Sequence, residues 1–149
     1  MKNILIIFFF LVFNSSAFSQ ISDEMTIEEL IEKGDEFCRD KGDFENGILF
    51  YDRAIALDSE NILVYQKRAF AYFASRDFIK ADKEFTFIIS KNTDDLADMY
   101  FMRGLSRSLF EVEDVDGACK DFRKAKELGY DTKSLNGLNE YCNTTDLED

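Results

Sequence analysis

The segment Ala118-Cys119-Lys120-Asp121-Phe122-Arg123-Lys124-Ala125 places an aromatic residue four positions after one small residue and three positions before another. The same spacing occurs twice earlier in the chain, where the three positions are occupied by Gly47, Tyr51 and Ala54, and then by Ala81, Phe85 and Ile88. The first two copies begin 34 residues apart. A repeat of about this period indicates an array of similar supersecondary units.

Apolar residues recur at helical spacing throughout the region that contains the three copies. The first helix begins after a capping box formed by Thr26 and Glu29, and it extends to about Asp40. Five further helices are predicted: residues 44–57, one helix from residue 62, one from residue 78, one that ends near Glu111, and residues 115–128. The pattern therefore predicts an all-helical protein.

Length and composition are those of a single compact domain. The chain has 149 residues, of which 46% are apolar and 15% aromatic, so it contains enough apolar material for a packed core. It contains no proline, which leaves the predicted helices uninterrupted. We expect one domain, residues 20–149.

Residues 1–19 have the pattern of a secretory signal peptide. Lys2 precedes an apolar run from Ile4 to Phe13, and small residues follow where a signal peptidase requires them. The alternative is a transmembrane anchor, but ten apolar residues form about 15 Å of helix, roughly half of the hydrocarbon thickness. We therefore expect cleavage before Gln20, and a periplasmic or secreted protein with no lipid anchor or membrane insertion.

The predicted mature chain is strongly acidic. Removal of Lys2 leaves 17 basic and 30 acidic residues, a formal charge of −13. The basic residues are scattered among the acidic ones, whereas nucleic-acid binding needs clustered Lys and Arg that release counterions from the phosphates. Nucleic acid is thus excluded as a main partner, and an anionic membrane surface is disfavoured.

The sequence contains no recognisable catalytic or metal-binding constellation. The absence of histidine removes the commonest general base and the imidazole metal ligand. The acidic residues between Glu111 and Asp116 lack the ligand spacing and the closing Glu of a calcium loop. No P-loop, nucleophile elbow or dinucleotide fingerprint is present. We predict a protein that is not an enzyme and needs no cofactor or metal.

The chain from residue 27 to about residue 131 resembles the tetratricopeptide repeat (TPR) family, whose unit is two antiparallel helices in about 34 residues. Besides the three triplets, the resemblance rests on Leu30, Gly34 and Phe37, then Tyr65, Ala69 and Tyr72, then Tyr100 and Gly104. Small residues let two helix backbones approach closely, and the aromatic residue fills the space beside them. The resemblance implies an all-α, right-handed α-solenoid of three repeats, at about residues 27–61, 62–95 and 97–131.

A capping helix at about residues 132–142 completes the expected architecture. Leu135, Leu138 and Tyr141 would share one face of this helix. The exposed end of a repeat stack needs such a cover.

The sequence departs from the family pattern at several positions. Ile88 replaces a small residue, one residue is inserted before Asp43, and Arg107 occupies the place of an aromatic residue. The third repeat also gains two residues, which leaves the helix register open between Arg107 and Asp114.

In the TPR family the first helix of each repeat lines a concave groove, so the resemblance implies that partner-binding residues lie there. The candidates are Arg39, Lys67, Phe70, Phe73, Phe101, Met102 and Leu105. The groove is expected to be acidic at one end and apolar at the other, which suits a peptide with aromatic or aliphatic anchors and some positive charge. Alternatively, the Phe and Leu side chains belong to the core between helices. Part of the family binds a partner's C-terminal carboxylates, but this chain offers mainly Lys67 and Arg39 for that purpose.

The three cysteines are Cys38, Cys119 and Cys142, and export places them in an oxidising compartment. A disulfide between Cys119 and Cys142 is favoured because both lie in the C-terminal part of the chain, whereas Cys38 belongs to the first helix. The resemblance to small exported bacterial TPR proteins adds to this expectation. The alternative is three buried thiols that behave as small hydrophobic side chains.

Together these features favour a non-catalytic adaptor of the bacterial cell envelope that binds a peptide or protein segment of unknown identity in its groove. The alternative is a structural scaffold that self-associates and has no separate ligand. The two differ in whether the purified protein forms oligomers, because only a scaffold requires self-association.

Overall fold

A computed structural model of the protein describes residues 24–110, 114–131 and 142. The predicted signal peptide and residues 132–141 of the predicted capping helix lie outside the described residues. In the part of the chain that is described, no helix is long and apolar enough to cross a membrane.

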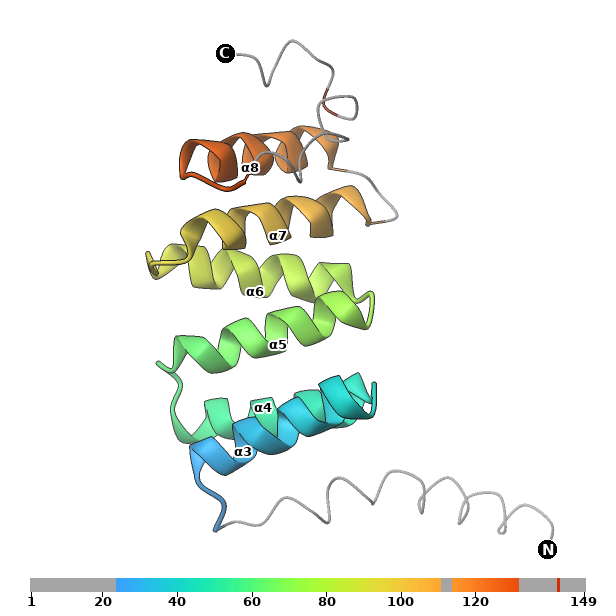
Figure 1. Cartoon of the computed structure of the whole chain (residues 1–149), viewed down its shortest axis with the longest axis vertical. Coiled ribbons are helices and arrows are strands. Elements are labelled where there is room, and N and C mark those ends of the chain that lie inside the picture. The colour runs from blue at the N-terminus through green and yellow to red at the C-terminus, as the bar shows by residue number, and fades with distance from the viewer. Residues whose placement is uncertain (1–23, 111–113, 132–141, 143–149) are drawn as a thin grey trace, which may run out of the picture. The chain divides into compact units, whose positions relative to one another are not determined.

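The described residues form an all-α helical repeat fold (Figure 1). Its elements are α3 (Ile27–Asp35), the π-helical segment η1 (Glu36–Asp40), α4 (Phe44–Leu57), α5 (Ile62–Ala74), α6 (Phe78–Ser90), α7 (Leu96–Ser108) and α8 (Val115–Glu127). The six predicted helices are thus confirmed. The first of them is divided into α3 and η1.

The helices belong to two compact units. The first unit ends at Arg68 and the second begins at Ala69, so the boundary lies within α5. In the first unit α3 packs against α4, and in the second unit α7 lies between α6 and α8 (Figure 1).

The second helix of each predicted repeat begins with the same aspartate cap. Asp43 accepts a hydrogen bond from the backbone N–H of Asn46, Asp77 from that of Lys80, and Asp114 from that of Gly117. Such caps satisfy backbone donors that have no partner inside the helix. The capping aspartate therefore recurs with the repeat, at the start of α4, α6 and α8.

The π-helical segment accommodates the residue that the first repeat gains before Asp43. The backbone N–H of Lys41 donates to the carbonyl of Glu36, five positions earlier, at 3.3 Å. A turn of this kind takes one more residue than an α-helical turn. The insertion is therefore absorbed inside the first helix, and α4 keeps its predicted start at Phe44.

Close helix packing in the first unit depends on Gly34 of α3 and Tyr51 of α4. A Cβ atom at Gly34 would lie 2.4 Å from Cε1 of the Tyr51 ring, so no larger residue fits there without displacing the ring. Leu30 and Ala54 are fully buried, as expected for the core positions of the first repeat.

The second unit repeats the arrangement with Gly104 of α7 and Phe122 of α8. A Cβ atom at Gly104 would lie 2.6 Å from Cε1 of Phe122. Phe122 and Phe85 are both fully buried, and so is Ile88, although it replaces a small residue. Each aromatic residue of the repeated triplet therefore occupies a core position.

The predicted end of the fifth helix is wrong by three residues. α7 ends at Ser108 rather than near Glu111, and Leu109 follows as the capping residue with 52% of its surface exposed. The hydroxyl of Ser108 donates to the carbonyl of Leu105. Such a side-chain bond competes with continuation of the backbone ladder.

Candidate functional site

In the first unit, Lys67 forms an ion pair with Asp35. The Nζ atom of Lys67 lies 2.6 Å from Oδ2 of Asp35, and the two side chains are 27% and 21% exposed. The hydroxyl of Tyr51 donates to the other carboxylate oxygen at 2.7 Å. The carboxylate of α3 is therefore fixed by one donor from α4 and one from α5.

The pKa values around this pair follow from burial and hydrogen bonding. Burial alone would raise the pKa of Asp35, but the hydrogen bonds from Lys67 and Tyr51 outweigh it and lower this pKa below its ordinary value. Burial and the neighbouring Asp35 raise the pKa of Tyr51, which therefore stays protonated and donates. The arrangement requires an ionised Asp35.

Replacing Lys67 by methionine is expected to destabilise the protein by about 1 kcal/mol at neutral pH, because Asp35 loses a charged hydrogen-bond donor. A carboxyl group whose pKa is lowered in the folded state stabilises that state at pH values above the pKa that the group has in the unfolded chain, about 3.9. The contribution is lost as the pH falls through the lower folded-state pKa. Urea unfolding from pH 7 to pH 2 should therefore show a difference between the two proteins that shrinks toward acid. A difference independent of pH would contradict this assignment.

The other basic candidate of the first unit, Arg39, is exposed. Its Nε atom lies 3.8 Å from a carboxylate oxygen of Asp40, and 73% of its side chain is accessible. Both candidate cations of the first unit therefore have an acidic residue as a close neighbour, Lys67 far more tightly than Arg39.

In the second unit, the candidates Phe70 and Phe73 make ring contacts with α6. Phe70 packs edge-on against Phe85 at a centroid distance of 5.6 Å, and Phe73 packs against Phe78 at 5.5 Å. Phe70 nevertheless keeps 42% of its surface exposed, whereas Phe73 is partly buried. Of the two, Phe70 presents more apolar surface to a partner.

The candidates Phe101 and Leu105 are partly buried on α7. Both pack against a buried cluster that consists of Ala118, Cys119, Phe122 and Cys142. The Phe101 ring also stacks on Tyr130, with a centroid distance of 4.2 Å and an interplanar angle of 19°. Part of their surface is therefore core, which agrees with the alternative interpretation of these residues. Met102, the remaining candidate on α7, is partly buried as well.

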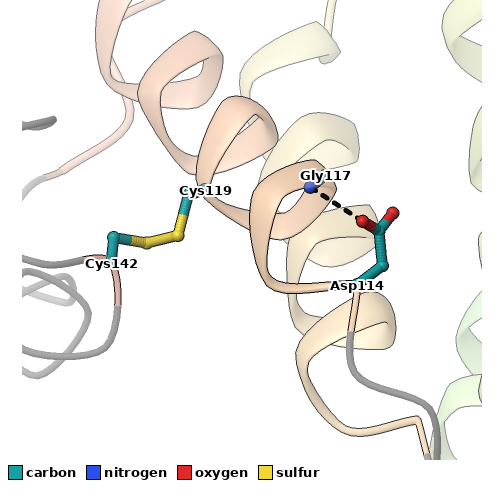
Figure 2. The surroundings of a disulfide bond; sticks show 4 residues. All are labelled: Asp114, Gly117, Cys119 and Cys142. Atoms are coloured by element: carbon teal, nitrogen blue, oxygen red, sulfur yellow. Dashed lines mark hydrogen bonds between the residues drawn. A yellow bond between two sulfur atoms is a disulfide. The ribbon is translucent and has the colours of Figure 1, made fainter.

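Cys119 and Cys142 are joined by a disulfide in the structure (Figure 2). Their Cα atoms are 5.6 Å apart, and both residues are buried beside α8. The link attaches residue 142 to the helix that carries the third copy of the repeated triplet. Cys38 of the first unit has a free thiol, and burial raises its pKa, which lowers its reactivity.

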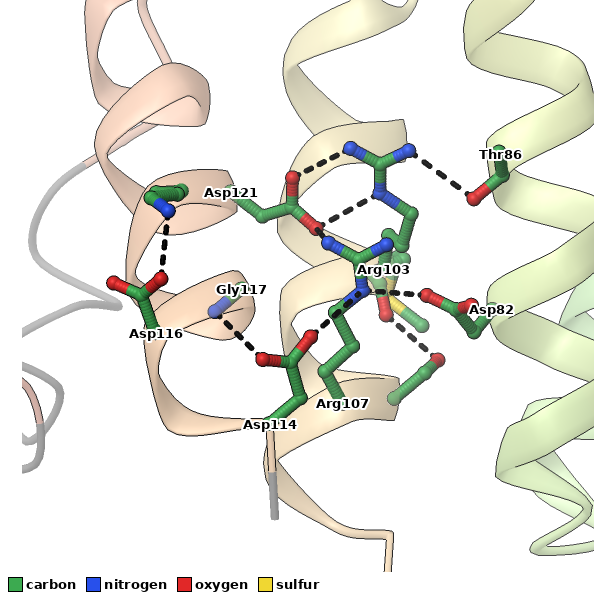
Figure 3. A network of polar contacts seen from close by, with 11 residues as sticks. Asp82, Thr86, Arg103, Arg107, Asp114, Asp116, Gly117 and Asp121 are labelled. Atoms are coloured by element: carbon green, nitrogen blue, oxygen red, sulfur yellow. Dashed lines mark hydrogen bonds and ion pairs between the residues drawn. The ribbon is translucent and has the colours of Figure 1, made fainter. Parts of the chain in front are cut away.

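The second unit also contains a polar network that the sequence analysis did not predict (Figure 3). Arg103 of α7 donates two hydrogen bonds to Asp121 of α8, at 2.6 and 2.8 Å, and a third to Thr86 of α6 at 3.1 Å. Arg107 binds Asp121 at 3.0 Å and Asp82 of α6 at 2.6 Å. The network therefore connects three helices through one buried carboxylate.

The electrostatics of the network favour its ionised form. Burial alone would lower the pKa of Arg103, but the hydrogen bonds and charge of Asp121 outweigh it and raise this pKa. The Asp121 side chain is only 4% exposed, so the two arginines supply the hydrogen bonds that water would otherwise provide. Arg107, which replaces an aromatic residue of the family pattern, thus has a structural role of its own.

No group of three or more potential metal-ligating side chains occurs within residues 24–110, 114–131 and 142. The polar groups that do converge there, at Asp35 and Asp121, are paired with basic residues. The arrangement can therefore hold helices together.

No protein-family model matches the chain, but a curated protein is similar to most of it. RNA polymerase II-associated protein 3 from Xenopus laevis is 29% identical over 109 residues, which represent 73% of this chain but only 16% of that protein. The chain thus spans a small part of the length of this curated relative.

Solved structures of TPR domains match over most of the chain. The first TPR of Spaghetti (RPAP3), bound to the HSP90 peptide SRMEEVD, superimposes with a TM-score of 0.68 at 24% identity, and the match covers 82% of this chain and 94% of that one. The Arabidopsis OM64 TPR domain gives a TM-score of 0.67 at 25% identity and covers 80% and 95%. The described residues form six helices with repeated small–aromatic contacts, in agreement with these matches. The chain therefore has the tetratricopeptide repeat fold.

Proposed function

We propose that the protein is a non-catalytic module that binds a peptide or protein segment. The observation that carries this proposal is the structural likeness to a TPR domain that was solved with a peptide bound. The pattern of residues 1–19 supports export, which would place the module in the bacterial cell envelope as an adaptor or in the extracellular space.

The chemistry of the described surface indicates a partner with apolar anchors. Phe70 is a large exposed side chain on a helix that belongs to the predicted groove, and aromatic residues of this kind often dominate binding energy. The chain has a formal charge of −12, so a neutral or positively charged segment meets less repulsion than an acidic one.

Replacing Phe70 by alanine is expected to weaken peptide binding by about tenfold or more, because an aromatic side chain that is buried by the bound peptide contributes about 2 kcal/mol to binding. Peptides selected from a random display library against the purified protein provide the ligands, and fluorescence anisotropy gives their dissociation constants. Leu63→Ala is the matched control, since Leu63 lies on the same helix and is 52% exposed.

Equal affinities for Phe70→Ala and the unsubstituted protein would contradict the groove assignment. Light scattering over a concentration series tests the alternative function, because a scaffold should increase in mass with concentration whereas a peptide-binding module can remain monomeric.

A further inference from the structure

The pairing of Asp35 with Lys67 determines what charge the first unit can offer to a ligand. Asp35 is held from two sides, by the Lys67 ammonium at 2.6 Å and by the Tyr51 hydroxyl at 2.7 Å. Both members of the ion pair are partly buried. The pair is therefore positioned by three helical elements and is more than a contact between mobile surface side chains.

An acidic ligand must compete with this internal carboxylate. The carboxylate of a peptide would have to displace or share the Lys67 ammonium, and it would lie close to the negative charge of Asp35. Arg39, the other candidate cation of the first unit, lies beside Asp40. Neither basic side chain offers a charge without an acidic neighbour, so a ligand carboxylate gains little there.

We propose that Asp35 is a specificity-determining residue that excludes acidic segments from the first unit. Discrimination of this kind comes from a repulsive element directed against one class of ligand. The inference rests on the proposed peptide-binding function, and it assigns neutral or basic segments as the partners of this module. It also distinguishes the chain from the TPR domain that was solved with SRMEEVD, a peptide with three acidic side chains.

The test uses SRMEEVD as the probe and Asp35→Asn as the variant. Asparagine keeps the shape of the side chain and can still accept the hydrogen bond from Tyr51, while Lys67 loses its counter-ion. We expect the variant to bind the peptide at least about tenfold more tightly than the unsubstituted protein, which corresponds to one newly available Lys–carboxylate interaction of about 1.4 kcal/mol. NMR titration of the isotopically labelled protein measures affinities in this weak range.

Two further variants separate local pairing from overall charge. Glu32→Gln removes the same charge from the same helix at an exposed position, so it should leave the affinity for SRMEEVD nearly unchanged. Adding Lys67→Met to Asp35→Asn should abolish the gain, because it removes the cation. Raising the salt concentration should reduce the gain as well.

An unchanged affinity in Asp35→Asn would overturn the proposal, and so would an equal gain in Glu32→Gln or a gain that survives Lys67→Met. These outcomes do not depend on the natural partner. A failure of the Phe70→Ala experiment would instead remove the proposed groove and leave the effect of Asp35 on acidic peptides to be measured as before.

Discussion

Replacing Asp121 by alanine is expected to lower the free energy of unfolding by about 3 kcal/mol or more. The substitution leaves Arg103 without the carboxylate that accepts its two short hydrogen bonds, although only 13% of the Arg103 side chain is exposed. A buried charge that loses its partner bears the full cost of desolvation. Chemical denaturation followed by circular dichroism measures the change.

The expected cost is specific to the buried network, and Asp116→Ala is the control. Asp116 lies on the same helix as Asp121 (Figure 3). It pairs with Lys120, but 83% of its side chain is exposed. Exposed pairs contribute little because water screens them. Equal effects of the two substitutions would show that Asp121 contributes no more than a surface pair.

The sequence predicts the helices of this protein well because the signals that specify them are local. Residues 44–57 form α4 as predicted, and the triplet positions are buried in each repeat. Periodicity and small–aromatic spacing are properties of neighbouring residues along the chain. The end of α7 was predicted wrongly because no glycine or proline marks it.

The polar contacts could not be predicted in the same way. Arg107 breaks the family pattern, and its partners Asp82 and Asp121 lie on two other helices. Whether these side chains meet depends on the orientation of each helix. The sequence leaves the helix register open between Arg107 and Asp114, so it does not define that orientation. Lys67 was identified as a candidate cation, but its pairing with Asp35 joins residues 32 positions apart in the sequence. The candidate residues could thus be chosen by residue type, and their use as a site stays a prediction. The charges that neighbour them could be identified only from the structure.

Replacing Phe122 by alanine is expected to destabilise the protein by about 3 to 5 kcal/mol, because removal of the fully buried ring leaves a cavity. The ring fills the space over Gly104 and packs against Phe101 at a centroid distance of 5.8 Å. A cost below about 1 kcal/mol in urea denaturation would contradict the view that this aromatic residue holds α7 and α8 together.

A double-mutant cycle with Gly104→Ala tests the packing itself. In the unsubstituted protein the added Cβ would lie 2.6 Å from the Phe122 ring, and the resulting strain of about 1 to 3 kcal/mol exceeds the gain of up to about 1 kcal/mol from replacing glycine in a helix. In the Phe122→Ala background the ring is absent, so the same substitution should become stabilising. A change of sign in the effect of Gly104→Ala on the free energy of unfolding would indicate a steric conflict with the ring. If α7 were generally intolerant of substitution, Gly104→Ala would destabilise the protein in both backgrounds.

Gly34→Ala is the matched control for this cycle, because the ring that closes over Gly34 is that of Tyr51, which belongs to the first unit. Its cost should be the same whether residue 122 is phenylalanine or alanine, since separate sites contribute additively to stability. If the sign changed at Gly34 as well, the reversal at Gly104 would reflect a general property of the weakened protein. A reversal confined to Gly104 would show that the small residue of the first helix is required specifically by the aromatic residue of the second.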